Sequence, residues 1–399
     1  MKILVIGTID NKGGAAGVSW ELRRRLKADG HTVSTFVRYK YSDEPDVFVI
    51  PRKRYQDWLV KFFANDLRFA NTGYIFDTKE YKEADLVHCH NLHSNFFNLR
   101  DLIRMSREKP VVWTIHDLWA ITGFSNDKAT LKNPNKKKFL FCLWDTTSRL
   151  LATKKKIYDR SKLRVVAVSD WLKSELEKSV LRNQNITRIE NGIDTLIFKP
   201  YDKQTTRLEL GLPTGKKIVG FFKKGWVDSK KLVETYHDRD DVIFLSLNNV
   251  PWKDKRVIPI PEIKEGAPMA KYLSAMDVLL YPTTGDTFGL VAAEAMACGT
   301  PVVTYDTDAL PEIVVHRETG FLVPREDISG AKYGIEYILG LSQKEYENIQ
   351  KHSRDRAMKL FTSERMYREY LELYKKAISE RERQKTGSRD SVKHAPEIL

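Results

Sequence analysis

Two acidic residues, Asp286 and Glu294, stand eight positions apart where a polar loop runs into an apolar segment. Between Leu290 and Cys298 every residue except Glu294 is apolar or small, which predicts a buried helix. Gly299 then supplies a helix stop. Because a buried carboxylate is costly without partners, Glu294 either pairs with a structural cation or faces a cleft where a ligand donates hydrogen bonds. With Asp286 near the helix N-terminus, the pair predicts a ligand site.

Histidines gather at the ends of two predicted strands. His88, His90 and His93 lie within six residues. In a strand His88 and His90 share a face, so a zinc site is one interpretation and ordinary hydrogen bonding is the other. His116 ends the next strand, with Asp117 beside it. Ligands bind outside the carboxyl ends of parallel strands, which makes His116 the stronger functional candidate.

A glycine-rich turn, Gly13-Gly14, follows the first strand, but its spacing is not that of a dinucleotide-binding fingerprint. The second strand ends in Arg38 and lacks the acidic residue that would hold a ribose hydroxyl. No Gly-Lys-Ser/Thr follows a glycine at the P-loop interval. The Gly13-Gly14 backbone can still approach a diphosphate closely, because neither residue carries a side chain. Asp306-Thr307-Asp308 is interpreted as an ordinary loop rather than a metal site.

The composition limits the class of protein. The chain has 399 residues, 42% of them hydrophobic, and a formal charge of +14. It contains no zinc-finger spacing and no RNA-recognition signature, so we expect no nucleic-acid partner. The N-terminal MKILVIG passes directly into a strand, and no apolar run approaches the roughly 18–20 residues of a membrane span. We therefore expect a cytoplasmic protein, with reduced thiols at Cys89, Cys142 and Cys298.

Short apolar strands alternate with amphipathic helices twice along the chain, which predicts an α/β fold with two parallel sheets. The expected strands are Lys2–Ile6, His31–Arg38, Asp85–His90, Val111–His116 and Arg164–Ser169 in the first half, then Lys216–Phe222, Val242–Leu247, Val278–Tyr281 and Val302–Thr304 in the second. The expected domains are 1–198 and 207–362, joined by a polar linker at 199–206. A charged helix at 363–383, which can pack back on the first domain, and a disordered tail at 384–399 are expected to follow.

Two segments depart from this alternation. Aromatic and aliphatic residues recur at helical spacing in 51–69, among basic residues. This segment is interpreted first as a helix that packs on the N-terminal core, and alternatively as a face that rests on the inner surface of a membrane or on a lipid-linked acceptor. Residues 124–138 are rich in Asn, Lys and Pro and are expected to form a loop over the carboxyl end of the fourth strand.

Taken in order, the motifs resemble those of the family 4 retaining glycosyltransferases, which have the GT-B fold, over nearly the whole chain. The resemblance lies in Gly13-Gly14 with Gly30–Val33, His88-Cys89-His90, Thr114–Asp117, Ser169–Leu172, Glu190–Asp194 with Phe198 and Pro200, Tyr272–Asp277, Phe288-Gly289-Leu290, Glu294–Ala297, Gly299–Val303, Pro311–Val314 and Gly320–Pro324. The Trp171-Leu172 pair and the run at 116–119 look most similar to bacterial exopolysaccharide-type members.

This resemblance implies two Rossmann-like domains, an N-terminal acceptor domain and a C-terminal donor domain, that face each other across a deep cleft. It implies catalytic roles for His116, Asp286 and Glu294, with Glu294 on the ribose of the nucleotide and Asp286 beside the donor sugar. It implies a metal-independent enzyme whose cations offset the charge of the diphosphate. The donor-binding residues that we expect are Gly13, Gly14, Lys223, Lys224, Lys231, Phe288, Gly289 and Leu290, with Lys230 as an alternative to Lys231.

The expected activity is transfer of a sugar, with retention, from a UDP- or GDP-sugar to a glycan or lipid-linked acceptor, without any cofactor. Three departures from the family pattern are an Asp at 286 instead of Glu, Phe222-Lys223-Lys224 where an Arg is usual, and Gly17 in the first turn. The Asp at 286 and the missing Arg motivate one alternative, a nucleotide-sugar-binding relative without transferase activity. A GT-B-shaped sugar-nucleotide epimerase is a further alternative.

Overall fold

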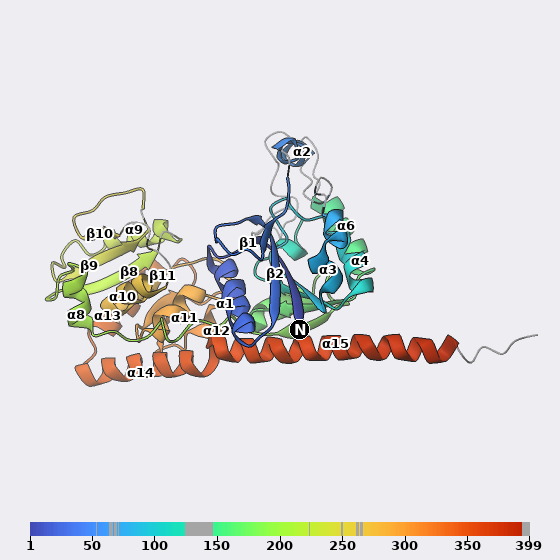
Figure 1. Ribbon diagram of the computed structural model, residues 1–399. Coiled ribbons are helices and arrows are strands. Elements are labelled where there is room, and N and C mark those ends of the chain that lie inside the picture. The colour runs from blue at the N-terminus through green and yellow to red at the C-terminus, as the bar shows by residue number, and fades with distance from the viewer. Residues whose placement is uncertain are drawn as a thin grey trace, which may run out of the picture. The chain divides into compact units, whose positions relative to one another are not determined.

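The computed structural model describes the chain except for residues 53, 64–66, 68, 69, 71, 124–146, 223, 249, 261, 262, 264, 265 and 393–399. The chain forms two compact units (Figure 1). Unit 1 consists of Met1–Ile189 with Met366–Leu399, and unit 2 consists of Glu190–Arg365. Unit 1 is thus made from both ends of the chain, and the predicted loop at 124–138 lies outside the described residues.

Unit 1 contains a seven-stranded sheet in which all neighbouring strands are parallel, in the order β3-β2-β1-β4-β5-β6-β7. The strands are β1 (Lys2–Ile9), β2 (Thr32–Tyr39), β3 (Val47–Val49), β4 (Leu86–Cys89), β5 (Val111–Ile115), β6 (Leu163–Ala167) and β7 (Asn185–Arg188). The order reverses direction between β1 and β4, and ligands of such sheets bind at this switch point, outside the carboxyl ends of the strands.

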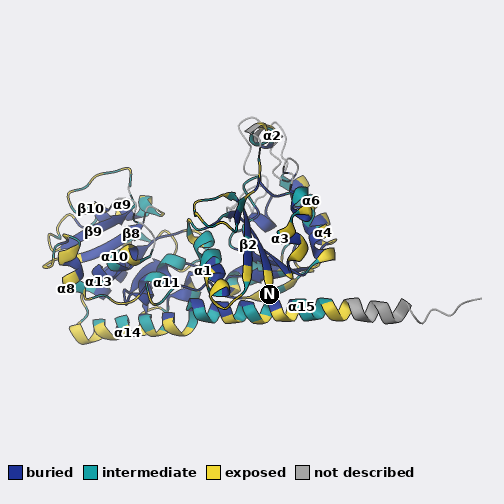
Figure 2. Ribbon diagram, viewed as in Figure 1, coloured by how far each residue is buried: buried dark blue, intermediate teal, exposed yellow. Residues whose placement is uncertain are grey.

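Helices cover this sheet, and its central strands are buried on both faces (Figure 2). The helical elements of unit 1 are α1 (Gly14–Ala28), α2 (Arg54–Phe63), η1 (Gly73–Asp77), α3 (Lys79–Glu83), α4 (Asp101–Glu108), η2 (Trp119–Ile121), α6 (Thr147–Tyr158), α7 (Asp170–Glu177) and α15 (Ser363–Val392). Strands buried on both faces read as continuous apolar runs, which is why β4 and β5 were recognisable in the sequence.

Unit 2 repeats the plan with a six-stranded parallel sheet in the order β10-β9-β8-β11-β12-β13. Its strands are β8 (Lys217–Phe222), β9 (Val242–Leu247), β10 (Val257–Ile260), β11 (Val278–Tyr281), β12 (Val302–Tyr305) and β13 (Gly320–Val323). Its helices are α8 (Lys203–Glu209), α9 (Trp226–Glu234), α10 (Ala267–Ala275), α11 (Leu290–Ala297), α12 (Leu310–Ile313), α13 (Ile328–Leu339) and α14 (Gln343–Leu360). The direction of the strand order reverses between β8 and β11.

The predicted α/β class with two parallel sheets is confirmed, and the nine predicted strands all form. Four further strands, β3, β7, β10 and β13, were not predicted. Each has only three or four residues and lies at or next to a sheet edge. Such short strands show too little periodicity to be distinguished from loops by sequence alone.

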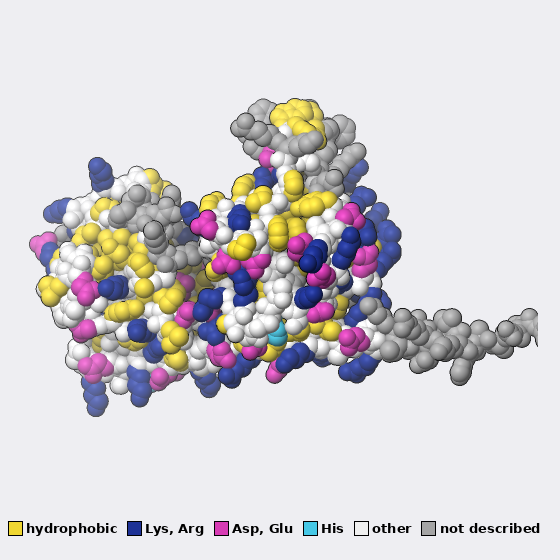
Figure 3. Space-filling view, viewed as in Figure 1, with side chains coloured by type: hydrophobic (Ala, Val, Ile, Leu, Met, Phe, Trp, Pro, Cys, Tyr) yellow, Lys and Arg dark blue, Asp and Glu magenta, His cyan; other side chains and the backbone are white. Residues whose placement is uncertain are grey.

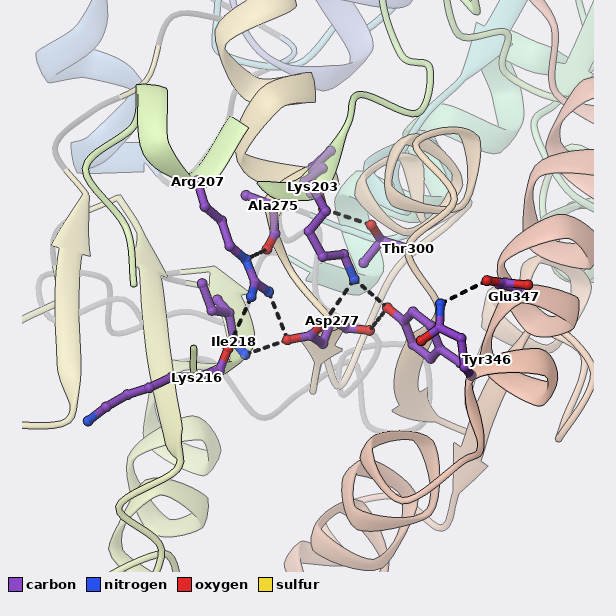
Figure 4. Close-up of polar contacts among 11 residues, drawn as sticks. Lys203, Arg207, Lys216, Ile218, Ala275, Asp277, Thr300, Tyr346 and Glu347 are labelled. Carbon is purple, nitrogen blue, oxygen red and sulfur yellow. Dashed lines mark hydrogen bonds and ion pairs between the residues drawn. The ribbon is translucent and has the colours of Figure 1, made fainter. Parts of the chain in front are cut away.

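The polar stretch 199–206 differs from its interpretation as an interdomain linker, because α8 begins within it and belongs to unit 2. Two basic side chains of α8 reach the buried carboxylate of Asp277 (Figure 4). Lys203 Nζ lies 2.9 Å from Oδ1 and Arg207 Nη2 lies 2.8 Å from Oδ2. Burial raises the pKa of Asp277, but these two ion pairs outweigh it and hold the pKa below its usual range. The stretch is thus tied to unit 2 by a buried carboxylate, although most of its residues are exposed.

The C-terminal helix α15 packs on unit 1, to which it contributes a stripe of buried side chains at helical spacing. The stripe consists of Met366, Tyr367, Tyr370, Tyr374 and Ala377. The helix continues to Val392, past the predicted end at residue 383, and the last part of the predicted tail, 393–399, lies outside the described residues. Unit 1 is therefore completed by a segment that follows unit 2 in the sequence.

The aromatic segment at 51–69 forms the ten-residue helix α2 in its described part. Val60 on this helix is buried, whereas the side chains of Tyr55, Trp58 and Phe62 are 57%, 60% and 51% exposed. Among the described residues, no helix combines the length and the apolar character that crossing a bilayer requires.

Candidate active site

The predicted site residues fall into two groups, one in each unit. In unit 2, Asp286, Glu294, Lys224 and the segment Phe288-Gly289-Leu290 lie around the loop that joins β11 to α11, whereas Lys231 lies on α9. In unit 1, Gly13-Gly14 opens α1 and His116 follows β5. Lys223 lies outside the described residues.

The carboxylate of Asp286 is held by four donors. Its Oδ2 lies 2.6 Å from the hydroxyl of Tyr281 and 3.1 Å from Nζ of Lys224. Its Oδ1 accepts the backbone N–H groups of Phe288 and Gly289 at 3.3 and 3.2 Å. These are N–H groups that we expected a donor sugar or phosphate to meet. The side chain of Asp286 thus turns back onto the N-terminus of α11. It is shorter than a Glu side chain by one methylene.

Glu294 lies on α11 and is only partly exposed, although its neighbours Ala293 and Ala295 are buried. Glu294 thus shares the partly exposed face of α11 with Leu290 and Val291. The negative charge of Glu294 interacts electrostatically with the buried side chain of Tyr281. Burial first, and then the charges of Asp286 and Glu294, raise the pKa of Tyr281 well above its usual value. The Tyr281 phenol is therefore a neutral donor within electrostatic reach of both carboxylates.

Two glycines bring these groups together. Gly225, at φ 82°, precedes α9, and a Cβ there would stand 2.6 Å from the carbonyl oxygen of Pro282. This close approach places the preceding residue, Lys224, beside Asp286. Gly289 precedes α11 at φ 100°, and a Cβ there would stand 2.9 Å from Cδ2 of Leu310. Both positions thus have a left-handed backbone that favours glycine, and at Gly225 the backbone of Pro282 also leaves no space for a side chain.

Lys231 does not join this group in the structure. Its Nζ lies 3.1 Å from Oδ1 of Asp228, on the same helix, and its side chain is 59% exposed. The other oxygen of Asp228 accepts the hydroxyl of Tyr305 at 2.9 Å. Tyr305 belongs to the core on the α9 and α13 face of the sheet, whereas α11 packs on the other face.

In unit 1, His116 forms a pair with His90. Nε2 of His116 lies 3.0 Å from Nδ1 of His90, and the two rings stack at 5.3 Å between centroids. Burial lowers the pKa of His116 to about 4, although the charge of Asp117 acts in the opposite direction. Burial, together with the neighbouring histidines, lowers the pKa of His90 well below its usual value. Both rings are therefore neutral at physiological pH, and each serves as a hydrogen-bonding group.

The zinc interpretation of the histidine cluster is not supported at His88. Its Nε2 lies 2.8 Å from the hydroxyl of Thr114, and its Nδ1 lies 2.6 Å from the hydroxyl of Tyr374 on α15. With both ring nitrogens engaged by protein hydroxyls, this side chain has no lone pair to offer a metal. Among the described residues no group of three or more potential ligands is placed to hold a metal ion.

A cavity of about 310 Å³ opens beside Gly13-Gly14 in unit 1. It lies at the carboxyl ends of β1, β2 and β4, and His90 is part of its lining. The turn, the cavity and His116 are thereby linked, because His90 borders the cavity and bonds to His116. Gly13 has φ 92° just before α1, a conformation that favours glycine.

Sequence reasoning missed two residues of these groups. Tyr281 was recognised only as the last residue of a strand, and His90 only as a member of a histidine cluster. A polar side chain that ends a buried parallel strand is the signal that both share, and the same signal selected His116.

Two family models match the chain. One, described as Glycosyltransferase Family 4, matches residues 12–195, and the other, described as Glycosyl transferases group 1, matches residues 245–340. The first match lies almost entirely in unit 1 and the second lies in unit 2.

Among curated proteins, the chain is similar to N-acetyl-alpha-D-glucosaminyl L-malate synthase of Bacillus anthracis, with 26% identity over 243 residues. The similarity covers 53% of this chain and 58% of that protein, so the chain spans little more than half of the relative's length. Two solved structures share the fold. Sucrose-phosphate synthase from Thermosynechococcus elongatus has a TM-score of 0.72 at 20% identity, over 95% of this chain and 100% of that chain. Anabaena HepE in complex with UDP has a TM-score of 0.69 at 16% identity, over 94% and 100%.

Proposed function

The chain belongs to glycosyltransferase family 4 and has the GT-B fold, and from this we propose that it transfers a sugar from a nucleoside-diphosphate sugar to a glycan or lipid-linked acceptor. The donor is a UDP- or GDP-sugar, and the anomeric configuration is retained. The solved relative HepE was crystallised with UDP, which supports a nucleotide ligand of this kind.

One observation carries the proposal, namely the arrangement of two carboxylates and an ammonium around the entrance of α11. We assign to Glu294 the role of accepting hydrogen bonds from the ribose, and to Asp286 that of accepting from a hydroxyl of the donor sugar in place of one of its present donors. Lys224 is 54% exposed, and its ammonium has three N–H donors, so one of them can bond to Asp286 while others meet a phosphate oxygen. The positive charge opposes the negative charge that develops on the leaving diphosphate, and no metal is needed for this role.

The proposed step breaks the bond between the anomeric carbon and the diphosphate oxygen. The acceptor oxygen attacks the same face from which the diphosphate leaves, so the configuration is retained. The acceptor proton passes to a phosphate oxygen of the departing nucleoside diphosphate. His116 is a neutral ring and acts as a hydrogen-bonding group toward the sugar rather than as a cation.

Release of nucleoside diphosphate from UDP- and GDP-sugars tests the proposal. We expect release from the wild-type protein, loss of release in Glu294→Ala, and normal release in the control Glu234→Ala, whose side chain is 59% exposed on α9. Undiminished turnover in Glu294→Ala would contradict it. A thermal-shift series with UDP, GDP, ADP and TDP identifies the base. Nucleotide binding without turnover would indicate the non-enzymatic alternative, and conversion of the sugar without an acceptor would indicate the epimerase.

We further propose that α2 makes peripheral contact with a membrane that carries a lipid-linked acceptor. Tyr55, Trp58 and Phe62 are separated by three and four residues, which puts their exposed side chains on one helix face. The rings of Trp58 and Phe62 stack at 5.1 Å, and Figure 3 shows a hydrophobic patch over α2. Exposed aromatic residues on a basic protein suit the interface of an anionic bilayer.

Sedimentation with phosphatidylglycerol vesicles tests this contact. The double variant Trp58→Ser, Phe62→Ser should lose most of its vesicle binding because it removes two large exposed aromatic side chains of α2. Tyr333→Ser, which removes a 57% exposed aromatic residue from α13, is the matched control. Equal sedimentation of the double variant and the wild type would exclude α2 as the contact.

A further inference from the structure

We propose that another cavity of unit 1 binds the phosphate group of a small soluble phosphomonoester. This basic cavity has a volume of about 260 Å³ and lies at the amino ends of β5, β6 and β7. The predicted site residues of unit 1, in contrast, lie at the carboxyl ends of its strands. Because none of those residues lines the basic cavity, the proposal does not depend on the transferase function.

The wall formed by the sheet is held in place by internal hydrogen bonds. Gln184 accepts the N–H of Leu163, the first residue of β6, at 2.9 Å, and its amide nitrogen donates to the carbonyl of Tyr158 at 2.9 Å. The N–H of Lys162 donates to the hydroxyl of Ser106 at 3.1 Å. The turn before β6 is thereby fixed, and the side chain of Lys162 projects from a defined backbone.

The opposite wall is one face of α15. Its lining residues are Ala377, Arg381 and Gln384, and their spacing of four and three residues places them on the same side of the helix. Ala377 is fully buried, and because its side chain is a single methyl group it fills little of the space between the helix and the sheet. The cavity therefore lies between α15 and the strand ends, with a guanidinium on the helix side.

The lining is basic. Four of its side chains are cationic, namely Lys109, Lys162, Arg164 and Arg381, and its described residues include no Asp or Glu. Arg164 forms an ion pair with Glu380, which is not part of the lining. Three positive charges therefore face a space in which no carboxylate offsets them, and this favours an anionic ligand.

Two of these cations are free to bind a ligand. In the described part of the chain, neither the exposed Lys162 ammonium nor the half-buried Arg381 guanidinium forms a hydrogen bond or an ion pair through its side chain. The ammonium of Lys109, in contrast, donates to the carbonyls of Lys82 and Ala84 at 3.0 and 2.6 Å. Lys109 thus adds positive charge, while Lys162 and Arg381 supply the available donors.

These donors suit a phosphomonoester. A phosphate monoester carries about −1.5 to −2 charges at pH 7 and presents three acceptor oxygens. The planar guanidinium of Arg381 can bind two of them, and the ammonium of Lys162 acts as a point charge toward the third. The amide groups of Asn185 and Gln384, in the same lining, are further donors. The volume, slightly below the roughly 300–1,000 Å³ of typical small-molecule sites, leaves room for a small body attached to the phosphate.

A lipid headgroup has the same chemistry, but the topology favours a soluble ligand. All neighbouring strands of this sheet are parallel, so their amino ends lie at one edge and their carboxyl ends at the other. The helix α2 follows the carboxyl end of β3, and in Figure 1 it lies at the end of unit 1 away from α15. A bilayer in contact with α2 would therefore be on the side away from the basic cavity.

Calorimetric titration of the full-length protein at constant ionic strength tests the proposal. The probes are glucose 6-phosphate, glycerol 3-phosphate and inorganic phosphate, with glucose as the uncharged control and phosphatidic acid vesicles as the lipid probe. The site variants are Lys162→Gln and Arg381→Gln. Lys376→Gln removes one positive charge from an exposed position of α15 outside the lining, and Lys224→Gln reports on phosphate binding in the candidate donor site.

We expect saturable binding of at least one phosphomonoester, about tenfold weaker binding in Lys162→Gln and in Arg381→Gln, and wild-type binding in Lys376→Gln and Lys224→Gln. Glucose should not bind with comparable affinity. Since Lys162 is exposed, its replacement should leave the fold intact, so the comparison does not depend on Arg381 alone.

Four outcomes would overturn the proposal. They are the absence of saturable phosphomonoester binding, an equal loss in Lys376→Gln, a loss in Lys224→Gln in place of the site variants, and binding to the vesicles alone. The second would indicate diffuse attraction by the basic surface, and the third a site in unit 2. None of them measures turnover, so each leaves the proposed transferase function to its own test.

Discussion

Replacing Tyr281 by Phe removes one hydroxyl and isolates its effect on Asp286. The hydroxyl donates to Oδ2 of Asp286 over 2.6 Å and is buried. A hydrogen bond to a charged group contributes about 1.5–3 kcal/mol, so the unfolding free energy should fall by about 2 kcal/mol. Asp286 keeps Lys224 and two backbone N–H donors, so its charge is not left unpaired.

The same loss should appear in catalysis if Asp286 meets the donor sugar. With one donor removed, the carboxylate is less firmly oriented, and kcat/KM should fall by about ten- to a hundredfold, the equivalent of about 1.4–3 kcal/mol. Nucleotide affinity should change little, because Glu294 is untouched. Turnover is measured as release of nucleoside diphosphate, nucleotide affinity by calorimetry, and stability by urea denaturation.

Tyr305→Phe provides the matched control. Tyr305 is also buried at the end of a strand and donates to a carboxylate, Asp228, which likewise pairs with a lysine. It faces the α9 side of the sheet, away from α11. We expect a comparable loss of stability and turnover within about twofold of wild type. Equal loss of turnover in the two variants, or normal turnover in Tyr281→Phe, would refute the assigned role of Asp286.

Three further predictions concern stability. Burial lowers the pKa of His88 to about 3, whereas the pKa in an unfolded chain is near 6.5. Below about pH 6.5 the unfolded state therefore binds a proton that the folded state does not. For this residue the free energy of unfolding should fall by roughly 1 kcal/mol per pH unit as the pH drops. Urea titrations between pH 7 and pH 5 measure this slope, which His88→Asn should reduce and the 70% exposed control His237→Asn should not. Arg207→Met should lower the free energy of unfolding by about 3–5 kcal/mol, because it breaks a buried ion pair and leaves the carboxylate of Asp277 one partner short. An unchanged melting temperature would contradict this. Lys154→Met should lower the free energy of unfolding by about 3 kcal/mol, because the fully buried ammonium donates to three backbone carbonyls of the turn that follows His116. A calorimetric melting temperature equal to that of the wild type would argue against this role.

The positions of most strands could be predicted, because buried parallel strands are short apolar runs and their carboxyl ends carry polar residues. Val242–Leu247 and Val278–Tyr281 have the predicted bounds. That the stretch 199–206 belongs to unit 2 could not be recognised, because a pair between Lys203 and a carboxylate 74 residues away leaves no local signal.

The candidate site could likewise be predicted from the sequence only in part. Glu294 was identifiable as an acid within an apolar helix, and Asp286 as an acid in the polar loop before it, but their surroundings were not. That Asp286 is bonded to Tyr281 and to the start of α11 depends on how the loop turns at Gly289. The hydrogen bond between His90 and His116 likewise depends on how β4 and β5 pair, which no sequence pattern encodes.

The origin of unit 1 from both ends of the chain has a consequence for biosynthesis. Tyr370 and Tyr374 cover Thr114 and His88, yet they are made only after the whole of unit 2 has been synthesised. Until then, the nascent N-terminal lobe exposes an apolar surface where α15 belongs. A truncated product that ends before Met366 would keep this surface exposed, and premature termination should therefore yield an aggregating species instead of a folded half.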